Sequence, residues 1–312
     1  MNTFITALTL SAPLLLLIGL GYFLKRIKMI SDNTSVELSK LVLNVLLPVN
    51  IFVSIYDSDF KTAFDLKLMG TIVGVNILCT VISIILVKLL SKDKKEISAM
   101  LQVWVRGNHT IFGLPLAISI SGAVVGAPMA IGAGLLSAVF SVYAVYVFEH
   151  YQNTNASLFK QLFNVLKTPL TLSVILAIIF KLINITIPPI TYTTLGYISK
   201  SLTGISLITI GASFNFTIDK KCIKLLIPSL IWKLVLMPVI GIICALALGY
   251  TGNELVIVFV LCAVPVAIAC FPTANCYDTD LELTKAATVY SHVACAIIIP
   301  VILSVLMSFG LV

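Results

Sequence analysis

The stretch RGNHTIFGLP, from Arg106 to Pro115, lies inside an apolar segment that is otherwise suited to cross a membrane. Proline removes a backbone hydrogen bond and clashes with the preceding turn of a helix. A charge near the membrane centre costs about 2.5 kcal/mol or more. In hydrocarbon, each freed backbone group costs several kcal/mol unless it finds a partner. The stretch therefore predicts an interrupted membrane helix whose polar groups are satisfied inside the protein.

The composition is that of a membrane protein with many spans. Of its 312 residues, 59% are hydrophobic and 11% are charged, whereas soluble domains are about 25% charged. The first basic residue is Lys25, so the N-terminal apolar segment reads as a retained span and not as a signal peptide. Spans of about 20 residues each are predicted at 4–24, 36–56, 67–90, 99–121, 128–148, 168–187, 195–216, 225–249, 254–275 and 286–310.

Basic residues are distributed unequally between the two sides of the membrane. Loops after the odd-numbered spans carry twelve of them, and the other side carries Lys61, Lys67 and Lys181. The twelve are Lys25, Arg26, Lys28, Lys92, Lys94, Lys95, Lys160, Lys167, Lys220, Lys221, Lys224 and Lys285. The positive-inside rule places them in the cytoplasm, so both termini are predicted to be extracellular. This bias accounts for the net charge of +7 without a nucleic-acid partner.

Ten spans divide into two groups of five, and an odd-numbered unit that is duplicated must enter the membrane from opposite sides. Pro13 and Pro115 are 102 positions apart, and Pro169 and Pro272 are 103 apart. The proline in the fourth span of each group lies in a polar cluster, and the second cluster is CFPTANCYD, 270–278. The pattern predicts two discontinuous helices that meet near the midplane, where half-helix N-termini suit an anion.

Three motifs resemble the auxin efflux carrier family: NVLLPVNIF (44–52), GNHTIFGLP (107–115) and PTANCYDTD (272–280). That family includes plant PIN-type auxin exporters and bacterial malate or malonate permeases. The resemblance covers essentially the whole chain. It implies an all-α membrane protein of ten transmembrane helices, built as two inverted five-helix repeats with broken, crossing helices four and nine. The short central linker resembles the compact bacterial permeases more than the plant exporters.

The resemblance also implies how the chain is divided. Helices 1, 2, 6 and 7 would form a scaffold, and helices 3–5 and 8–10 would form a mobile transport domain. Substrate would bind beside the crossing, near Asn108 and Pro115 of helix four and near Pro272 and Asn275 of helix nine. The implied parts are a first repeat at 1–150, a cytoplasmic linker at 151–167 and a second repeat at 168–312.

Two cations lie at membrane depth in the sequence. Arg106 is a candidate counter-ion for a substrate carboxylate, which a guanidinium can hold with two hydrogen bonds. The alternatives are snorkelling to the cytoplasmic surface or pairing with an internal acid. Lys233, in IWKLVLMP (231–238), is a candidate partner for a second carboxylate, and snorkelling is again the alternative.

The uncharged polar residues allow two interpretations each. Asn108 either binds substrate or caps the broken helix. His109 either takes up a proton during transport or forms structural hydrogen bonds, and His292 is interpreted as a satisfied interior residue. The candidate substrate-binding residues are Asn108, Arg106, His109, Pro115, Thr273, Asn275, Asn44, Asn50 and Lys233, and the candidate helix-break residues are Gly113, Pro115 and Pro272.

Together these features predict a secondary active transporter, and not an enzyme, in the plasma membrane. It would move a small organic anion, a mono- or dicarboxylate such as malate or malonate, by elevator-type alternating access. No cofactor or metal is expected. Coupling to H⁺ or Na⁺ stays open, as does a homodimer. The alternatives are a carrier of auxin or other indole acids and a membrane ligand sensor that does not transport.

Overall fold

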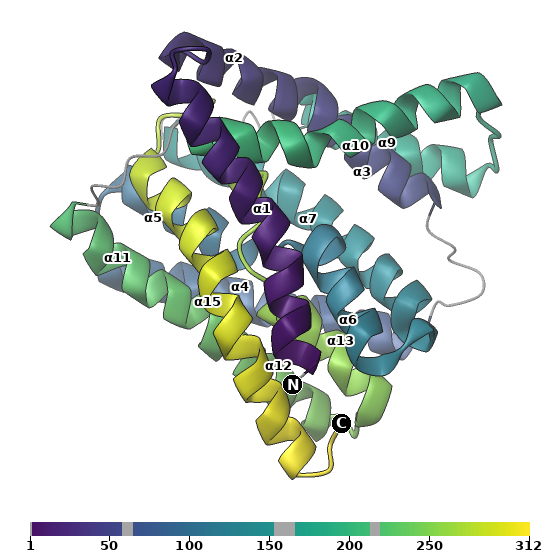
Figure 1. Ribbon diagram of the computed structural model, residues 1–312. Helices are drawn as coiled ribbons and strands as arrows, with labels where there is room; N and C mark the ends of the chain where they lie inside the picture. Colours follow the sequence, from purple (N-terminus) through teal and green to yellow (C-terminus); the bar gives the residue numbers. More distant parts are fainter. Residues whose placement is uncertain (1, 58–64, 153–165, 213–218) are drawn as a thin grey trace.

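The computed structural model describes residues 2–57, 65–152, 166–212 and 219–312 (Figure 1). Within these ranges the chain is helical, and its only strand-like feature is one isolated β-bridge. The predicted all-α class is therefore confirmed. Lys61, Lys160, residues 153–165 of the predicted linker and the last residues, 213–216, of the predicted span 195–216 lie outside the described residues.

Five helical stretches of the described chain are long and apolar enough to cross a membrane. They are Asp32–Asp57, Leu66–Leu90, Gly126–Gln152, Lys220–Ala247 and Leu281–Ser308. Three of the other predicted spans contain shorter apolar helices, which are His109–Ser121, Pro169–Leu182 and Gly252–Ala263. Two of these are short because a helix is interrupted, and the interruptions form the centre of the molecule.

One group of helices packs around α10 (Figure 1). α10 contacts α1, α2 and α3, and α3 also contacts α9. We call these five helices the α10 group. Their bounds are Asn2–Arg26 for α1, Asp32–Leu41 for α2, Leu47–Asp57 for α3, Pro169–Leu182 for α9 and Pro189–Ala212 for α10.

The backbones of α1 and α10 are in direct contact at two glycines. A Cβ atom on Gly211 would lie 1.9 Å from the carbonyl oxygen of Ile18, and one on Gly21 would lie 2.2 Å from that of Ile208. No side chain fits at either glycine without moving a helix. Small residues commonly permit such close approach between membrane helices.

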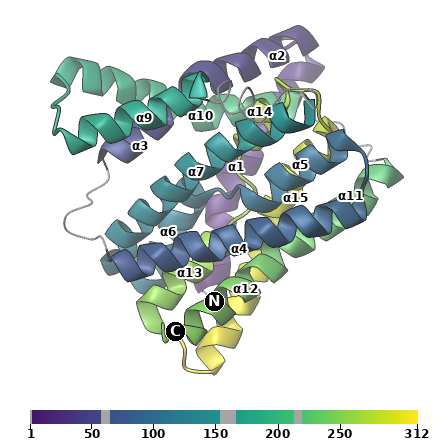
Figure 2. The same ribbon diagram turned by 180° about the vertical axis from the view of Figure 1, so that it is seen from behind.

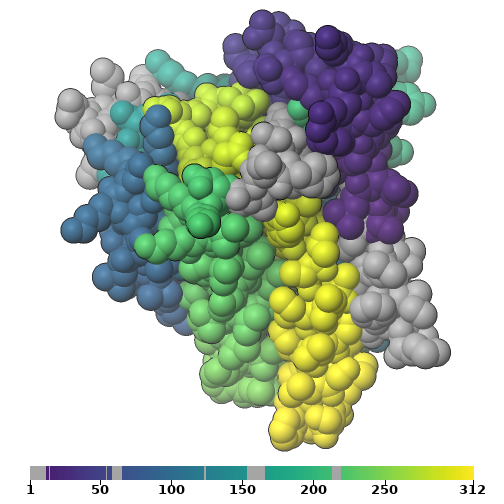
Figure 3. All heavy atoms as spheres, turned by 60° about the vertical axis from the view of Figure 1, so that its left-hand side comes forward, coloured from purple at the N-terminus to yellow at the C-terminus, as the bar shows by residue number. Residues whose placement is uncertain are grey.

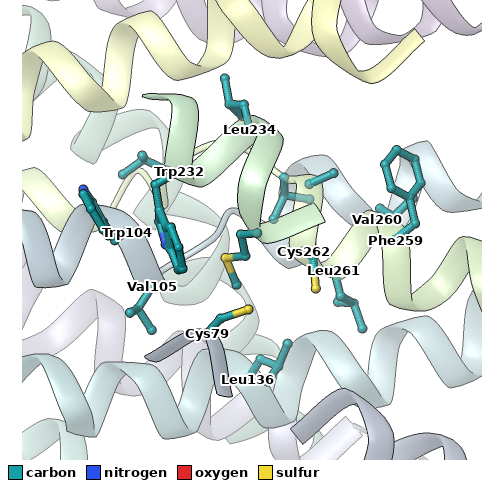
Figure 4. Packing of buried hydrophobic residues seen from close by; sticks show 14 of the residues in the cluster. Cys79, Trp104, Val105, Leu136, Trp232, Leu234, Phe259, Val260, Leu261 and Cys262 are labelled. Carbon is teal, nitrogen blue, oxygen red and sulfur yellow. The ribbon is translucent and has the colours of Figure 1, made fainter. Parts of the chain in front are cut away.

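The remaining helices pack around the main apolar core, and we call them the core group (Figure 2). Trp104 stacks on Trp232 there, with ring centroids 5.0 Å apart (Figure 4). Trp104 Nε1 also donates to Ser229 Oγ at 2.8 Å. The group consists of α4 (Leu66–Leu90), α5 (Lys94–Val105), α6 (Leu114–Ser121), α7 (Gly126–Gln152), α11 (Lys220–Ile231), α12 (Met237–Ala247), α13 (Gly252–Ala263), α14 (Cys270–Ala274) and α15 (Leu281–Ser308).

The outer surface of the core group is apolar. α11 and α12 lie beside α15 on the face shown in Figure 3. Ile227, Ile243, Ile297 and Val301 on these helices are all more than half exposed. Exposed aliphatic side chains on neighbouring helices are typical of a membrane or partner contact. Together with the lengths of the helices, they support a protein that crosses the bilayer several times.

Three π-helical turns each precede a proline. In each, the residue before the proline donates its N–H to the carbonyl five residues back, as Leu114 does to His109. A proline ring clashes with the carbonyl four residues earlier, and a widened turn relieves that clash. The turns are η1 (Val42–Leu46) before Pro48, η2 (His109–Gly113) before Pro115 and η4 (Trp232–Leu236) before Pro238.

Ion pairs join three of the loops that were assigned to the same side of the membrane by their basic residues. Lys95 Nζ lies 2.5 Å from Asp278 Oδ1, and Lys221 Nζ lies 2.6 Å from Glu96 Oε1. The hydrogen bond to Asp278 raises the pKa of Lys95. These contacts place the start of α5, the start of α11 and the loop before α15 at one end of the molecule.

Candidate functional site

Two interrupted helices meet at the centre of the protein. The first interruption is 106–108, between α5 and η2, and the second is 264–269, between α13 and α14. Asn108 N donates to Pro265 O at 2.9 Å, and Ala267 N donates to Arg106 O at 3.2 Å. The two extended segments therefore pair in antiparallel fashion around the bridge between Gly107 and Val266. Each segment provides hydrogen-bond partners for the backbone of the other, and lipid could not provide such partners.

The predicted break at Gly113, Pro115 and Pro272 is wrong. The chain is helical without a gap from His109 to Ser121, and Pro272 lies inside α14. The widened turn η2 accommodates Pro115, so no break is needed there. The proline of the second interruption is Pro265, seven residues earlier than expected.

Arg106 is buried at the first interruption, with 4% of its surface exposed. Its Nη1 donates to Gln102 Oε1 at 3.2 Å and to Thr273 Oγ1 at 3.4 Å, and its Nη2 donates to Ser141 Oγ at 3.5 Å. These bonds are long and every acceptor is neutral. No Asp or Glu of the described ranges forms an ion pair with it. Both alternatives, snorkelling and an internal acid, therefore disagree with the described structure.

Asn108 is oriented by a histidine of α15. Its Nδ2 lies 3.1 Å from His292 Nε2, and His292 Nδ1 lies 2.7 Å from Thr288 O. A carbonyl can only accept, so Nδ1 carries the proton and Nε2 accepts from Asn108. His292 is therefore a satisfied interior residue, as predicted. Because this contact uses one hydrogen of Asn108 Nδ2, the side-chain oxygen and the second hydrogen remain for other partners.

We call the two paired interruptions, 106–108 and 264–269, the crossing. A cavity of about 80 Å³ lies between the crossing, α7 and the α10 group. Its polar wall contains Arg106, Asn108 and His109, and Ser137 and Ser141 come from α7. Its opposite wall is mostly apolar. The lining residues are Leu47, Asn50, Ile51, Arg106, Gly107, Asn108, His109, Thr110, Ile111, Ser137, Phe140, Ser141, Leu202, Ala267, Ile268 and Ala269. They include one arginine and no carboxylate.

The start of a helix also faces this cavity. The helical stretch from His109 to Ser121 begins beside it, and the Asn108 side chain does not cap that end. The first amides of a helix have no partner in a preceding turn, and they carry positive partial charge. Because Thr110 and Ile111 line the cavity, this partial charge adds to that of Arg106.

The other candidate residues do not all reach the cavity. Asn50 lines it and donates to Ser199 Oγ at 2.8 Å. Thr273 lies behind Arg106 and helps to hold it. Asn44 is exposed and donates to Lys40 O at 3.0 Å, within its own helix.

Asn275, Pro115 and Lys233 are likewise absent from the cavity wall. Asn275 Nδ2 donates to Ser39 Oγ at 2.9 Å and so joins the loop after α14 to α2. Pro115 is one residue into α6. Lys233 is completely buried on η4 and does not line the cavity. To hold a second carboxylate of the substrate, as predicted, its amine would need to reach the cavity wall.

Sequence reasoning missed three residues that hold or line the site: Gln102, Ser137 and Ser141. Gln102 is one helical turn before Arg106, and the two serines are one turn apart in SAVFS, 137–141. Residues four apart lie on the same face of a helix. A search for polar pairs at that spacing could have found them.

A helical membrane protein in which two interrupted helices pair beside a polar cavity has an architecture typical of secondary transporters. The chain matches the family model described as membrane transport protein over residues 6–156 and 149–303. It therefore belongs to this transporter family, the auxin efflux carrier family. A search of curated proteins gives no significant match.

Proposed function

We propose that the protein is a secondary active transporter of a small organic anion, a mono- or dicarboxylate such as malate or malonate. The observation that carries this proposal is Arg106, a buried guanidinium at a cavity wall whose acceptors are all neutral. Burying a charge without an opposite charge is costly. An organic anion in the cavity would remove that cost.

The arrangement of the cavity matches a carboxylate. A guanidinium presents parallel N–H donors that fit the two oxygens of a carboxylate. The long bonds from Arg106 to Thr273 and Ser141 are easily exchanged for shorter, charge-assisted ones. The rest of the anion would lie toward Asn50 and the first amides of η2, which can donate to a second carboxylate or a hydroxyl.

We further propose that the α10 group is the scaffold and the core group is the transport domain of an elevator. The cavity lies between the two groups, since Leu47 and Leu202 line one side and the crossing lines the other. The paired interruptions support two inverted five-helix repeats. In this proposal the protein resides in the plasma membrane with both termini extracellular. The basic residues of the ion-paired loops support a cytoplasmic position for that end of the molecule.

Counterflow in proteoliposomes tests the proposed function. Vesicles loaded with unlabelled malate or malonate should accumulate the labelled acid in a saturable manner. Arg106→Gln should abolish this exchange, whereas Arg26→Gln, at an exposed arginine on α1, should retain it. Binding without exchange would indicate a ligand sensor. Exchange of indole acids, but not of small acids, would indicate an auxin-like carrier.

A further inference from the structure

We propose that Lys233 is a proton-binding site that couples anion binding to proton uptake. This inference rests on the proposed function and adds the coupling ion to it. Lys233 does not line the cavity. Its amine contacts the backbone carbonyl of Val105, the residue directly before Arg106. Its amine would be partly deprotonated in the empty protein and would take up the missing fraction of a proton when an anion binds.

The first argument is the environment of the Lys233 amine, which is fully buried on η4. Its Nζ lies 3.4 Å from Val105 O and 3.6 Å from Met237 Sδ. An ammonium has three donors, and a thioether is a weak acceptor. No carboxylate of the described ranges forms an ion pair with it. Such a site disfavours a permanent charge and allows the amine to lose its proton.

The second argument comes from the groups that surround the amine. The titratable groups near it are Cys79 on α4, Cys262 on α13, Cys270 on α14 and His109 on η2. The thiols carry no charge when buried in apolar surroundings. α15 also packs against η4, and its His292 is already bonded to Asn108 and Thr288. The surroundings therefore provide no fixed negative charge for Lys233.

His109 completes this environment. Its ring is buried, and neither ring nitrogen makes a hydrogen bond of normal geometry, although the backbone of Leu261 lies nearby. His109 lines the cavity and is also close enough to Lys233 to interact with its charge.

The third argument is the short connection to the anion site. The acceptor of the Lys233 amine is the carbonyl of Val105, the last residue of α5, and Arg106 follows it directly. A carboxylate on Arg106 brings negative charge close to the amine and favours its protonated form. By linkage, protonation of Lys233 must then strengthen anion binding by the same factor. The reaction is R–NH₂ plus H⁺ giving R–NH₃⁺, so a monoanion and its proton add no net charge.

Calorimetry of anion binding tests the proposal. Malonate is titrated into the purified protein in buffers with different ionisation enthalpies, which gives the number of protons taken up per bound anion. The wild type should take up a measurable fraction of a proton, at most one. Lys233→Met and Lys233→Arg should take up none, since a methionine has no proton site and an arginine does not release its proton. Lys224→Met, at an exposed lysine on α11, should behave as the wild type.

Every result of this titration bears on the proposal. Anion binding by the wild type without proton uptake overturns it and leaves the proposed function intact. Unchanged uptake in Lys233→Arg, or loss of uptake in His109→Gln with Lys233 in place, also overturns it and places the proton elsewhere. If the wild type binds no carboxylate at all, the proposed function fails first. Lys233→Arg keeps the test decisive if Lys233→Met does not fold.

Discussion

Replacing Gly211 by alanine should force α1 and α10 apart. The added Cβ would lie 1.9 Å from Ile18 O, whereas ordinary contact begins at 3.4 Å. The helices would have to separate by about 1.5 Å, because the obstructing atom belongs to the backbone and cannot rotate away. Overpacking of this kind costs about 1–3 kcal/mol, and the immobile backbone places this site at the upper end of that range.

Alanine also has an intrinsic advantage over glycine in a helix, of about 1 kcal/mol. The net loss expected for Gly211→Ala is therefore about 2 kcal/mol, which corresponds to a fall in Tm of about 4–8 °C in a large domain. Gly204→Ala is the matched control on the same helix, because nothing lies within 4 Å of its Cβ position. It should leave the Tm unchanged or raise it.

Thermal unfolding of the two variants in detergent, followed by intrinsic fluorescence, separates these expectations. The substitutions are chemically identical and lie two helical turns apart, so a general effect of alanine would appear in both. If Gly211→Ala is as stable as Gly204→Ala, the close packing of α1 on α10 is refuted, and with it the rigid contact on which the scaffold proposal depends.

Two further predictions concern single polar contacts. Asn108→Leu leaves His292 Nε2 without its hydrogen-bond donor. Denaturant unfolding should show a loss of stability of about 1–3 kcal/mol. Asn44→Leu, at an exposed position, is the control and should change the stability little. Burial raises the pKa of Asp280, which accepts from Leu283 N as the N-cap of α15. The ionised carboxylate therefore costs stability as the pH rises through that pKa. Asp280→Asn, which can still cap, should raise the Tm more at pH 8 than at pH 4, and an equal change at both would contradict this.

The sequence predicted the existence of the helices better than the place where they break. Long apolar runs are enough to predict helices such as α4 and α15, because lipid leaves the backbone few alternatives. Pro115 was a poor guide to the first interruption, since the π-helical turn before it absorbs its steric effect. The real break at Arg106 depends on pairing with Val266 and its neighbours. That contact joins segments about 160 residues apart, and no local pattern reports it.

The same limit applies to the candidate site. Arg106 and Asn108 could be recognised from their cost in a membrane helix, because a polar residue at that depth is a functional candidate by default. The direction of the Arg106 side chain depends on Gln102, Thr273 and Ser141, which come from three different segments. Placing Lys233 in a membrane helix is as costly as placing Arg106 there, so the sequence marks both as candidates. In the structure, however, the Lys233 amine faces the end of α5 and not the cavity.

The most direct test of the central claim is carboxylate binding to the purified protein, measured by thermal shift for the wild type, Arg106→Gln and Arg26→Gln side by side. Glutamine keeps hydrogen-bonding capacity at position 106 but removes the charge. We expect malate or malonate to raise the Tm of the wild type and of Arg26→Gln and to leave that of Arg106→Gln unchanged. An equal rise in all three proteins would contradict the assignment of Arg106 as the anion-binding group at the crossing.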